Sequence, residues 1–214
     1  FAIQDVYKFA ARPILAGRIE SGHLRRGDVL LFSPTNKPAR VASIEAWNVK
    51  EPVLAVRAGQ SIGVTLDEQL FVERGDVASL VSNPPMLTNV FRGRLFWLGR
   101  HPMTPGCRYK MKLCNAEFPV EVEKIERVID VSDLGTSAGE AVERNAVAEV
   151  VFRARRQVAL DPFENNMVTG RFVLVEDYDI VRAVPASMDG YADQRRSQAI
   201  RATNNFRDEH RAPQ

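Results

Sequence analysis

The sequence has few of the residues that build disulfide frameworks and metal sites. Its 214 residues include two cysteines and three histidines. Cys107 and Cys114 flank a segment that we expect to be extended, and such a strand spans about 23 Å, far beyond the Cα spacing of about 5.5 Å across a disulfide. The histidines, at positions 23, 101 and 210, are scattered. We therefore expect free thiols, as in a reducing cytoplasm, and no metal site.

The chain also lacks a long apolar run and an excess of charge of either sign. No apolar stretch approaches the roughly 20 residues that cross a bilayer, and no signal peptide is visible. Lys and Arg number 29 against 27 Asp and Glu. A protein that grips nucleic acid through its phosphates needs a larger basic excess. The composition thus argues against membrane and nucleic-acid partners, while 45% hydrophobic residues suffice for a packed core.

Short apolar stretches with a period of two dominate what is present. In "FPVEVEKI", Phe118, Val120 and Val122 alternate with charged residues, and "VAEVVFRAR" repeats the pattern with Val150 and Phe152 inward. Glycine, proline and asparagine separate these stretches. Many short strands with turn signals between them predict an all-β fold, and we expect two antiparallel β-barrels.

The best domain boundary is "SNPPMLTN", residues 82–89. Two successive prolines cannot donate to a ladder of strand hydrogen bonds, and they restrict the residues before them. We therefore predict one barrel over 1–84, a second over 88–184, and an irregular tail over 185–214.

The stretch "AGRIESGHLRRGDVLLF", residues 16–32, raises the question of a phosphate-binding loop. Such a loop needs a Lys-Ser or Lys-Thr pair after its last glycine and a helix behind it, and here a strand follows Gly27. We interpret Ser21-Gly22 as the turn of a hairpin. The two "RGD" triplets mark entries into strands, with Asp28 and Asp76 bonding turn amides rather than serving adhesion.

Several stretches, taken in order, resemble the second domain of translational GTPases. The succession "AGRIESGHLRRGDVLLF", "ASIEAWN", "VRAGQSIGVTL" and "FVERGDVAS" is similar to that of elongation factor Tu. The resemblance covers most of 1–84. It implies a small antiparallel barrel beside a G domain, followed by a second barrel.

Other stretches narrow the resemblance to the large, GTPase-bearing subunit of bacterial sulfate adenylyltransferase. They extend across residues 1–182 and include "FRGRLFWLGRHPMTPGCRYKMKL", "VERNAVAEVVFRARRQVALDPF" and "GRFVLVEDYDIV". In that family the large subunit hydrolyses GTP and couples it to a small subunit, which makes adenosine 5′-phosphosulfate from ATP and sulfate. The tail resembles the segment that leads into a fused adenylylsulfate kinase in bifunctional, nodulation-associated members. The resemblance thus implies a G domain before Phe1 and a kinase after Gln214.

The same resemblance implies ligands and partners. GTP and Mg²⁺ would bind the G domain outside this chain, and ATP would bind the small subunit and the kinase. We therefore expect no catalytic, cofactor-binding or metal-binding residue in the two barrels. The expected partners are the G domain and the small adenylyltransferase subunit in the cytoplasm, with the barrels transmitting the state of the GTPase switch.

Two loops are the candidates for partner contacts, because loops between strands carry function more often than the strands do. The segment "LDEQ" contributes Asp67 and Glu68, and "GRHP" contributes Arg100 and His101.

Other noticeable side chains have structural readings. Arg153 and its neighbours in "FRARR" suit the solvated side of a strand or ion pairs with Glu143 or Glu149. We expect Trp47 and Trp97 to pack in a core or between domains.

The rival interpretation is a nucleic-acid module, an elongation-factor barrel that grips aminoacyl-tRNA. Near-neutral charge offers little attraction for phosphate. Where elongation factor Tu has an arginine that meets the tRNA end, this chain has Asp67, and that reversal would be repulsive. A self-sufficient enzyme is a second rival, and it would need a nucleophile with its base or a phosphate loop, neither of which is recognisable.

Overall fold

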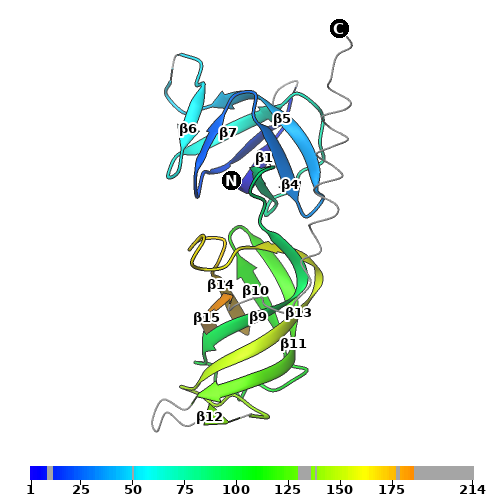
Figure 1. The fold of residues 1–214 in the computed structure, drawn as a ribbon, viewed down its shortest axis with the longest axis vertical. Coiled ribbons are helices and arrows are strands. Elements are labelled where there is room, and N and C mark those ends of the chain that lie inside the picture. The colour runs from blue at the N-terminus through cyan, green and yellow to red at the C-terminus, as the bar shows by residue number, and fades with distance from the viewer. Residues whose placement is uncertain (9–11, 50, 130–135, 138, 177–178, 186–214) are drawn as a thin grey trace. The chain divides into compact units, whose positions relative to one another are not determined.

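A computed structural model of the chain describes residues 1–8, 12–49, 51–129, 136–137, 139–176 and 179–185. All the secondary-structure elements of these described residues are β-strands, so the predicted all-β class is confirmed. The strands gather in two compact units, Phe1–Leu87 and a second that begins at Thr88 (Figure 1). No helix in this part of the chain is long and apolar enough to cross a membrane.

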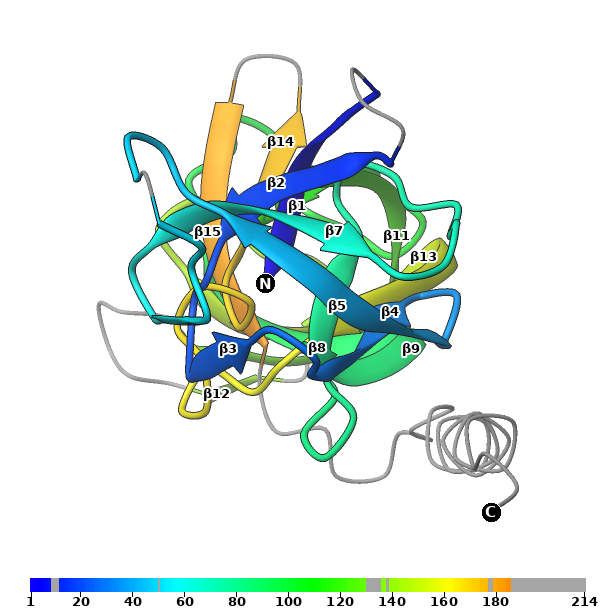
Figure 2. The same cartoon turned by 90° about the horizontal axis from the view of Figure 1, so that it is seen from above.

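The first unit is a closed antiparallel barrel with a two-stranded ribbon attached (Figure 2). Its strands are β1 (Ala2–Tyr7), β2 (Ile14–Arg18), β3 (His23–Arg25), β4 (Val29–Ser33), β5 (Lys37–Glu45), β6 (Ala55–Arg57), β7 (Ser61–Leu66) and β8 (Val77–Leu80). Strands β1, β2, β7, β5, β4 and β8 follow one another around the barrel, and β8 pairs with β1 to close it. Strands β3 and β6 pair only with each other.

The core of the first barrel is aliphatic, with Phe32 as its large aromatic side chain. Ile3, Phe32 and Val64 are fully buried. Leu24 and Val56 from the β3–β6 ribbon belong to the same cluster. Because strand residues alternate between faces, burying these two turns their neighbours on the ribbon outward.

The two "RGD" turns have the predicted structure. Gly27 and Gly75 have φ values of 90° and 94°, which favour glycine. The Arg25 amide donates to Asp28 Oδ2 over 2.8 Å, and the Glu73 amide donates to Asp76 Oδ2 over 3.0 Å. Each aspartate therefore caps the turn that leads into β4 or β8, as expected.

The predicted Ser21-Gly22 hairpin is wrong. Gly22 does adopt a turn conformation, with φ 71°. The strands on either side do not pair with each other, since β2 pairs with β1 and β7, whereas β3 pairs with β6. The local sequence signalled the turn, but burial of Leu24 against the barrel core selected a distant strand as the partner of β3.

The second unit is also a barrel. Its strands are β9 (Met86–Phe96), β10 (Arg108–Leu113), β11 (Ala116–Ile129), β12 (Thr136–Ser137), β13 (Val147–Leu160), β14 (Phe172–Glu176) and β15 (Asp179–Pro185). They form one sheet in the order β10, β14, β15, β9, β13, β11, β12. An additional antiparallel pairing of β10 with β11 closes six of them into a ring, with β12 at the edge of β11.

Three phenylalanines form the centre of the second core. The rings of Phe91, Phe152 and Phe172 lie 5.6–5.8 Å apart, centroid to centroid. A Cβ atom at Gly93 would lie 2.8 Å from the Phe172 ring, so this glycine allows the close approach. The inward positions predicted in "FPVEVEKI" and "VAEVVFRAR" are all buried, which confirms the period-two interpretation.

The cysteines are as predicted. Cys107 precedes β10 and Cys114 follows it, and the two do not form a disulfide.

Candidate functional site

Asp67 stands at the end of β7 and is bonded within its own barrel. The Asp67 amide donates to the Arg40 carbonyl over 3.0 Å, and the Arg40 amide donates back to Asp67 Oδ1 over 3.0 Å. Arg40 Nε lies 3.9 Å from Asp67 Oδ2, in a pair whose side chains are 42% and 31% exposed. The carboxylate thus ties the end of β7 to β5, which is a structural role at a partly exposed position.

A hollow of 140 Å³ lies beside Asp67 and Glu68. It is lined by residues 12, 13, 15 and 66–70, and Arg12 Nη1 donates to the Leu66 carbonyl over 3.3 Å. Sites for small molecules measure about 300–1,000 Å³, so this hollow suits a single side chain rather than a nucleotide. Sequence analysis missed Arg12 because nothing near it in the chain marks a contact with the 66–70 loop.

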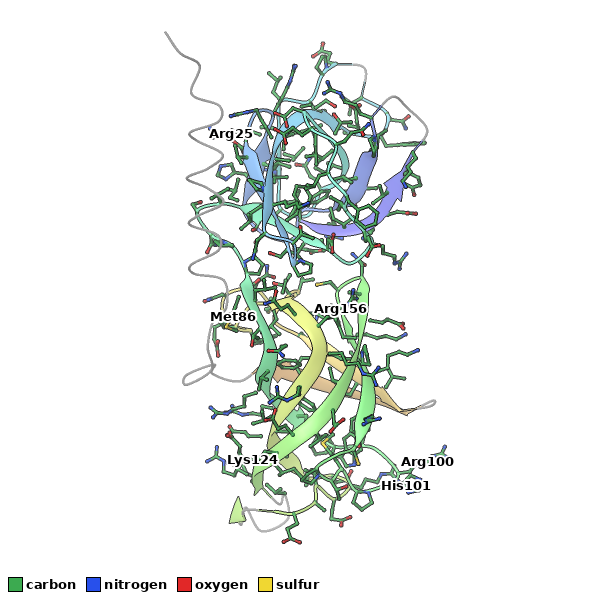
Figure 3. The ribbon with its side chains drawn as sticks, turned by 90° about the vertical axis from the view of Figure 1, so that its right-hand side faces the viewer. Arg25, Met86, Arg100, His101, Lys124 and Arg156 are labelled. Atoms are coloured by element: carbon green, nitrogen blue, oxygen red, sulfur yellow. The ribbon has the colours of Figure 1, made fainter. Side chains whose placement is uncertain are left out.

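Arg100 and His101 lie on the loop between β9 and β10, and both are exposed. Figure 3 shows the two side chains on the outside of the second unit, pointing away from its strands. Trp97, only 1% exposed, donates from Nε1 to the His101 carbonyl over 2.8 Å. The buried indole therefore anchors the backbone beneath the two exposed side chains.

A second set of bonds fixes the same loop. The amide of Met103 donates to the Val142 carbonyl over 3.0 Å, and the Val142 amide donates to the Met103 carbonyl over 2.8 Å. Both residues are fully buried. Because the backbone of this loop is held at both ends, it loses little further conformational entropy when a partner binds Arg100 and His101, which suits a contact surface.

The four candidates form two pairs. Asp67 and Glu68 lie on one loop of the first unit, and Arg100 and His101 lie on one loop of the second.

Several strand arginines of the second unit are paired with carboxylates. Arg94 Nη2 lies 2.7 Å from Glu149 Oε1, and Arg127 Nη2 lies 3.3 Å from the same oxygen. Arg153 lies on the exposed side of β13, which confirms one of the two expected alternatives, and it binds Glu123 over 2.8 Å rather than Glu143 or Glu149. The bulges between β11 and β13 shift the register and place Glu123 beside Arg153.

The charges of this unit suit ion pairing rather than acid–base chemistry. The hydrogen bond from Arg94 holds the pKa of Glu149 below its usual value of 4.5, and the bond from Lys112 does the same for the pKa of Glu117. A general acid needs a raised pKa instead. Across the described ranges, no three His, Cys, Asp or Glu side chains gather in a way that could hold a metal ion.

The two tryptophans have opposite environments. Trp97 is a core residue, as predicted, and its ring packs edge-on against Tyr109 with centroids 5.5 Å apart. Trp47 is 92% exposed, so the expectation that it packs in a core is wrong. Val49 and Leu54 on the same loop are 52% and 64% exposed. Sequence analysis missed this apolar surface because a hydrophobic residue in a loop carries no signal of its direction.

Comparison with known proteins gives consistent matches. Residues 90–184 match the family described as GTP-eEF1A C-terminal domain-like. The chain is 27% identical over 179 residues to sulfate adenylyltransferase subunit 1 of Shewanella oneidensis, covering 79% of this chain and 36% of that protein. It is 30% identical over 174 residues to the bifunctional enzyme NodQ of Azospirillum brasilense, covering 81% of this chain and 28% of that protein.

Among solved structures, Sup35 complexed with GDP has the same fold. Its TM-score is 0.79 at 20% identity, over 87% of this chain and 46% of that one. The chain itself spans about a third of the length of the curated relatives it matches. These matches confirm the resemblance that the sequence motifs indicated: the second barrel is GTP-eEF1A C-terminal domain-like, and most of the chain is homologous to a segment of sulfate adenylyltransferase subunit 1 and NodQ proteins.

Proposed function

We propose that the chain is the non-catalytic barrel portion of a GTP-hydrolysing subunit of sulfate adenylyltransferase. In this role it couples a G domain to the small subunit, which would transfer the adenylyl group of ATP to sulfate with release of pyrophosphate. The parent protein would take part in sulfate activation and, in a bifunctional form, would carry adenylylsulfate kinase as well. Nucleotides and Mg²⁺ would bind outside the two barrels.

The observation that carries the proposal is the length of the sequence similarity. It extends over about four-fifths of the chain, and therefore over both barrels, to proteins named sulfate adenylyltransferase subunit 1. A relay needs rigid bodies that move as units, and two closed barrels with separate cores suit that requirement.

We propose Arg100 and His101 as contacts for the partner, because they are exposed on a loop whose backbone is anchored by Trp97 and Met103. Asp67 contributes indirectly by holding the 66–70 loop against β5. Glu68 lines the hollow beside it, where one side chain of a partner would fit.

The nucleic-acid alternative receives no specific support. The likeness to Sup35, at 20% identity, concerns the fold. A formal net charge of +2 over 214 residues supplies little phosphate attraction.

Calorimetry with the purified small adenylyltransferase subunit tests the proposal. We expect the chain to bind that subunit and to leave a fluorescent GTP analogue unbound at micromolar concentrations. Absence of binding to the small subunit, under conditions in which a full-length relative binds it, would contradict the coupling role. Micromolar affinity for the GTP analogue would contradict the non-catalytic assignment.

A further inference from the structure

The loop that joins β5 to β6 displays more apolar side-chain surface than a solvated loop requires. Trp47 is 92% exposed, Leu54 64% and Val49 52%. Asn48 turns the chain between Trp47 and Val49, with φ 59°. Asparagine is among the few residues that tolerate this conformation, so a local turn holds Trp47 outward. Exposed apolar patches with polar rims mark interaction sites in water-soluble proteins.

A hollow of 310 Å³ opens beside this loop. Its lining comes from Arg26, from residues 43–46 of β5 and its end, and from residues 49 and 51–53. Ile44 and Val53, joined by an antiparallel bridge, supply apolar atoms to its wall. The volume accommodates a bulky side chain from another molecule, and Val49 stands at the rim with half of its surface in solvent.

A cationic face borders the apolar loop. On the β3–β6 ribbon, His23 pairs with Arg57 and Arg25 pairs with Ala55, and all four point outward because Leu24 and Val56 fill the core. The Arg26 amide donates to the Leu54 carbonyl over 2.9 Å, so this face adjoins the apolar loop directly. Figure 3 shows the Arg25 side chain on the outside of the first unit.

The two ribbon arginines differ from several strand arginines of the second barrel. Arg94, Arg108 and Arg153 each contact a glutamate on a neighbouring strand. Among the ion pairs of the residues that the structure describes, none involves the side chain of Arg25 or Arg57. A planar guanidinium can bind a carboxylate through two parallel hydrogen bonds.

The combination of an exposed tryptophan, aliphatic side chains and arginines is that of a protein-binding hot spot. Nucleic acid fits the same surface poorly. The formal net charge of the chain is only +2, which gives little attraction for the phosphates of a nucleic acid.

We propose that this surface, formed by Trp47, Val49, Leu54, Arg25 and Arg57, docks a protein that inserts an apolar side chain flanked by carboxylates. The apolar side chain enters the 310 Å³ hollow against Val49. The carboxylates stay outside the hollow, which Glu45 and Glu51 line, and pair with Arg25 and Arg57 on the β3–β6 ribbon. Trp47 and Leu54 cover the contact and exclude water. The surface extends the proposed function, and it rests on that function in the choice of the small adenylyltransferase subunit as the binding partner tested.

The chain carries its own reporter for this contact. Its two tryptophans are Trp47, which is exposed, and Trp97, which is buried. Iodide should therefore quench the emission of Trp47 and spare that of Trp97. In a complex with the small subunit, we expect Trp47 to lose most of its quenching and to shift its emission to shorter wavelength.

Paired variants separate the apolar and ionic contributions. Trp47→Ala with Leu54→Ala should weaken binding about tenfold or more, as hot-spot residues do. Arg25→Glu with Arg57→Glu should weaken it at least about fivefold at low salt, and added salt should reduce that difference.

The matched controls are Phe71→Ala, which removes an apolar side chain 73% exposed in the same barrel, and Arg155→Glu with Arg171→Glu, which reverses two exposed arginines of the second barrel. Both controls should bind as the parent chain does.

The possible outcomes have distinct meanings. If calorimetry detects no complex, the proposed function fails, and this inference fails with it. If a complex forms while Trp47 stays fully quenchable and both paired variants bind normally, only the docking surface is wrong. If sedimentation shows that the chain dimerises through Trp47 in the absence of a partner, a second copy occupies the surface and the assigned occupant is overturned.

Discussion

We predict that Gly99→Ala destabilises the Arg100–His101 loop, because the added methyl group collides with Trp97. A Cβ atom built at Gly99 would collide with Trp97 Cζ2 and would lie 2.6 Å from Trp97 Cε2. Neither contact is tolerable, so Gly99→Ala must displace the indole or the loop. Displacement breaks the Trp97 Nε1 bond to the His101 carbonyl, which measures 2.8 Å.

The cost has two parts. Overpacking a well-filled site destabilises a protein by about 1–3 kcal/mol. A buried indole N–H that loses its acceptor adds about 1–3 kcal/mol. Because a shift that relieves the clash also breaks the bond, the parts overlap, and we expect Gly99→Ala to lower the unfolding free energy of the second barrel by about 2–4 kcal/mol.

Urea unfolding followed by Trp97 emission measures this, in a Trp47→Phe background so that the second barrel alone reports. Gly106→Ala is the matched control: Gly106 has φ 88° and nothing lies within 4 Å of its Cβ position. Its cost is the left-handed backbone alone, about 1–2 kcal/mol. The reasoning is refuted if Gly99→Ala unfolds within about 0.5 kcal/mol of the parent, the ordinary range of a surface substitution.

Three further predictions concern charges and exposure. Glu149→Gln should destabilise the second barrel by about 1 kcal/mol at pH 7, since Arg94 and Arg127 lose their shared partner. The pKa of Glu149 is lower in the folded state than in the unfolded state, so the ion pair stabilises the fold above the unfolded pKa and this stabilisation is lost as the pH falls through the folded pKa. The difference in unfolding free energy between the parent chain and Glu149→Gln should therefore shrink below pH 4.5. A difference that stays constant with pH would argue against the ion pair. Asp67→Ala should speed hydrogen exchange at the Arg40 amide several-fold, whereas Asp67→Asn keeps an acceptor and should change it less; equal effects of the two variants would contradict the bond. Iodide should quench Trp47 and spare Trp97 in the isolated chain, and equal quenching of both would contradict their 92% and 1% exposures.

The fold was largely predictable because its signals are local or periodic. Alternation in "FPVEVEKI" placed Phe118 and Val122 inward, and both are buried. The aspartate of each "RGD" turn accepts a hydrogen bond from the amide three residues earlier, so the whole interaction lies within a four-residue stretch of sequence. Strand pairing was harder, and the hairpin expected at Gly22 failed because β3 finds its partner some 30 residues later along the chain.

The candidate site was only partly predictable for the same reason. The loops at residues 66–70 and 97–103 follow from where strands end, so Asp67 and His101 could be located on loops in advance. The hydrogen bond between the Arg40 amide and Asp67 could not be predicted, because the two residues lie 27 positions apart in sequence and meet only through the pairing of β5 with β7.

The amino-acid sequence alone determined the all-β class, the turns, the absence of a Cys107–Cys114 disulfide and the similarity to sulfate adenylyltransferase subunits. Each of these depends on residues that are neighbours in the chain or on a succession of motifs. Barrel closure decided the rest. It buried Trp97 in the second core, and it placed Arg25 beside Ala55 on an outward face. The physical reason is that burial and cross-strand contact are properties of the closed sheet, which brings together residues that the sequence keeps far apart.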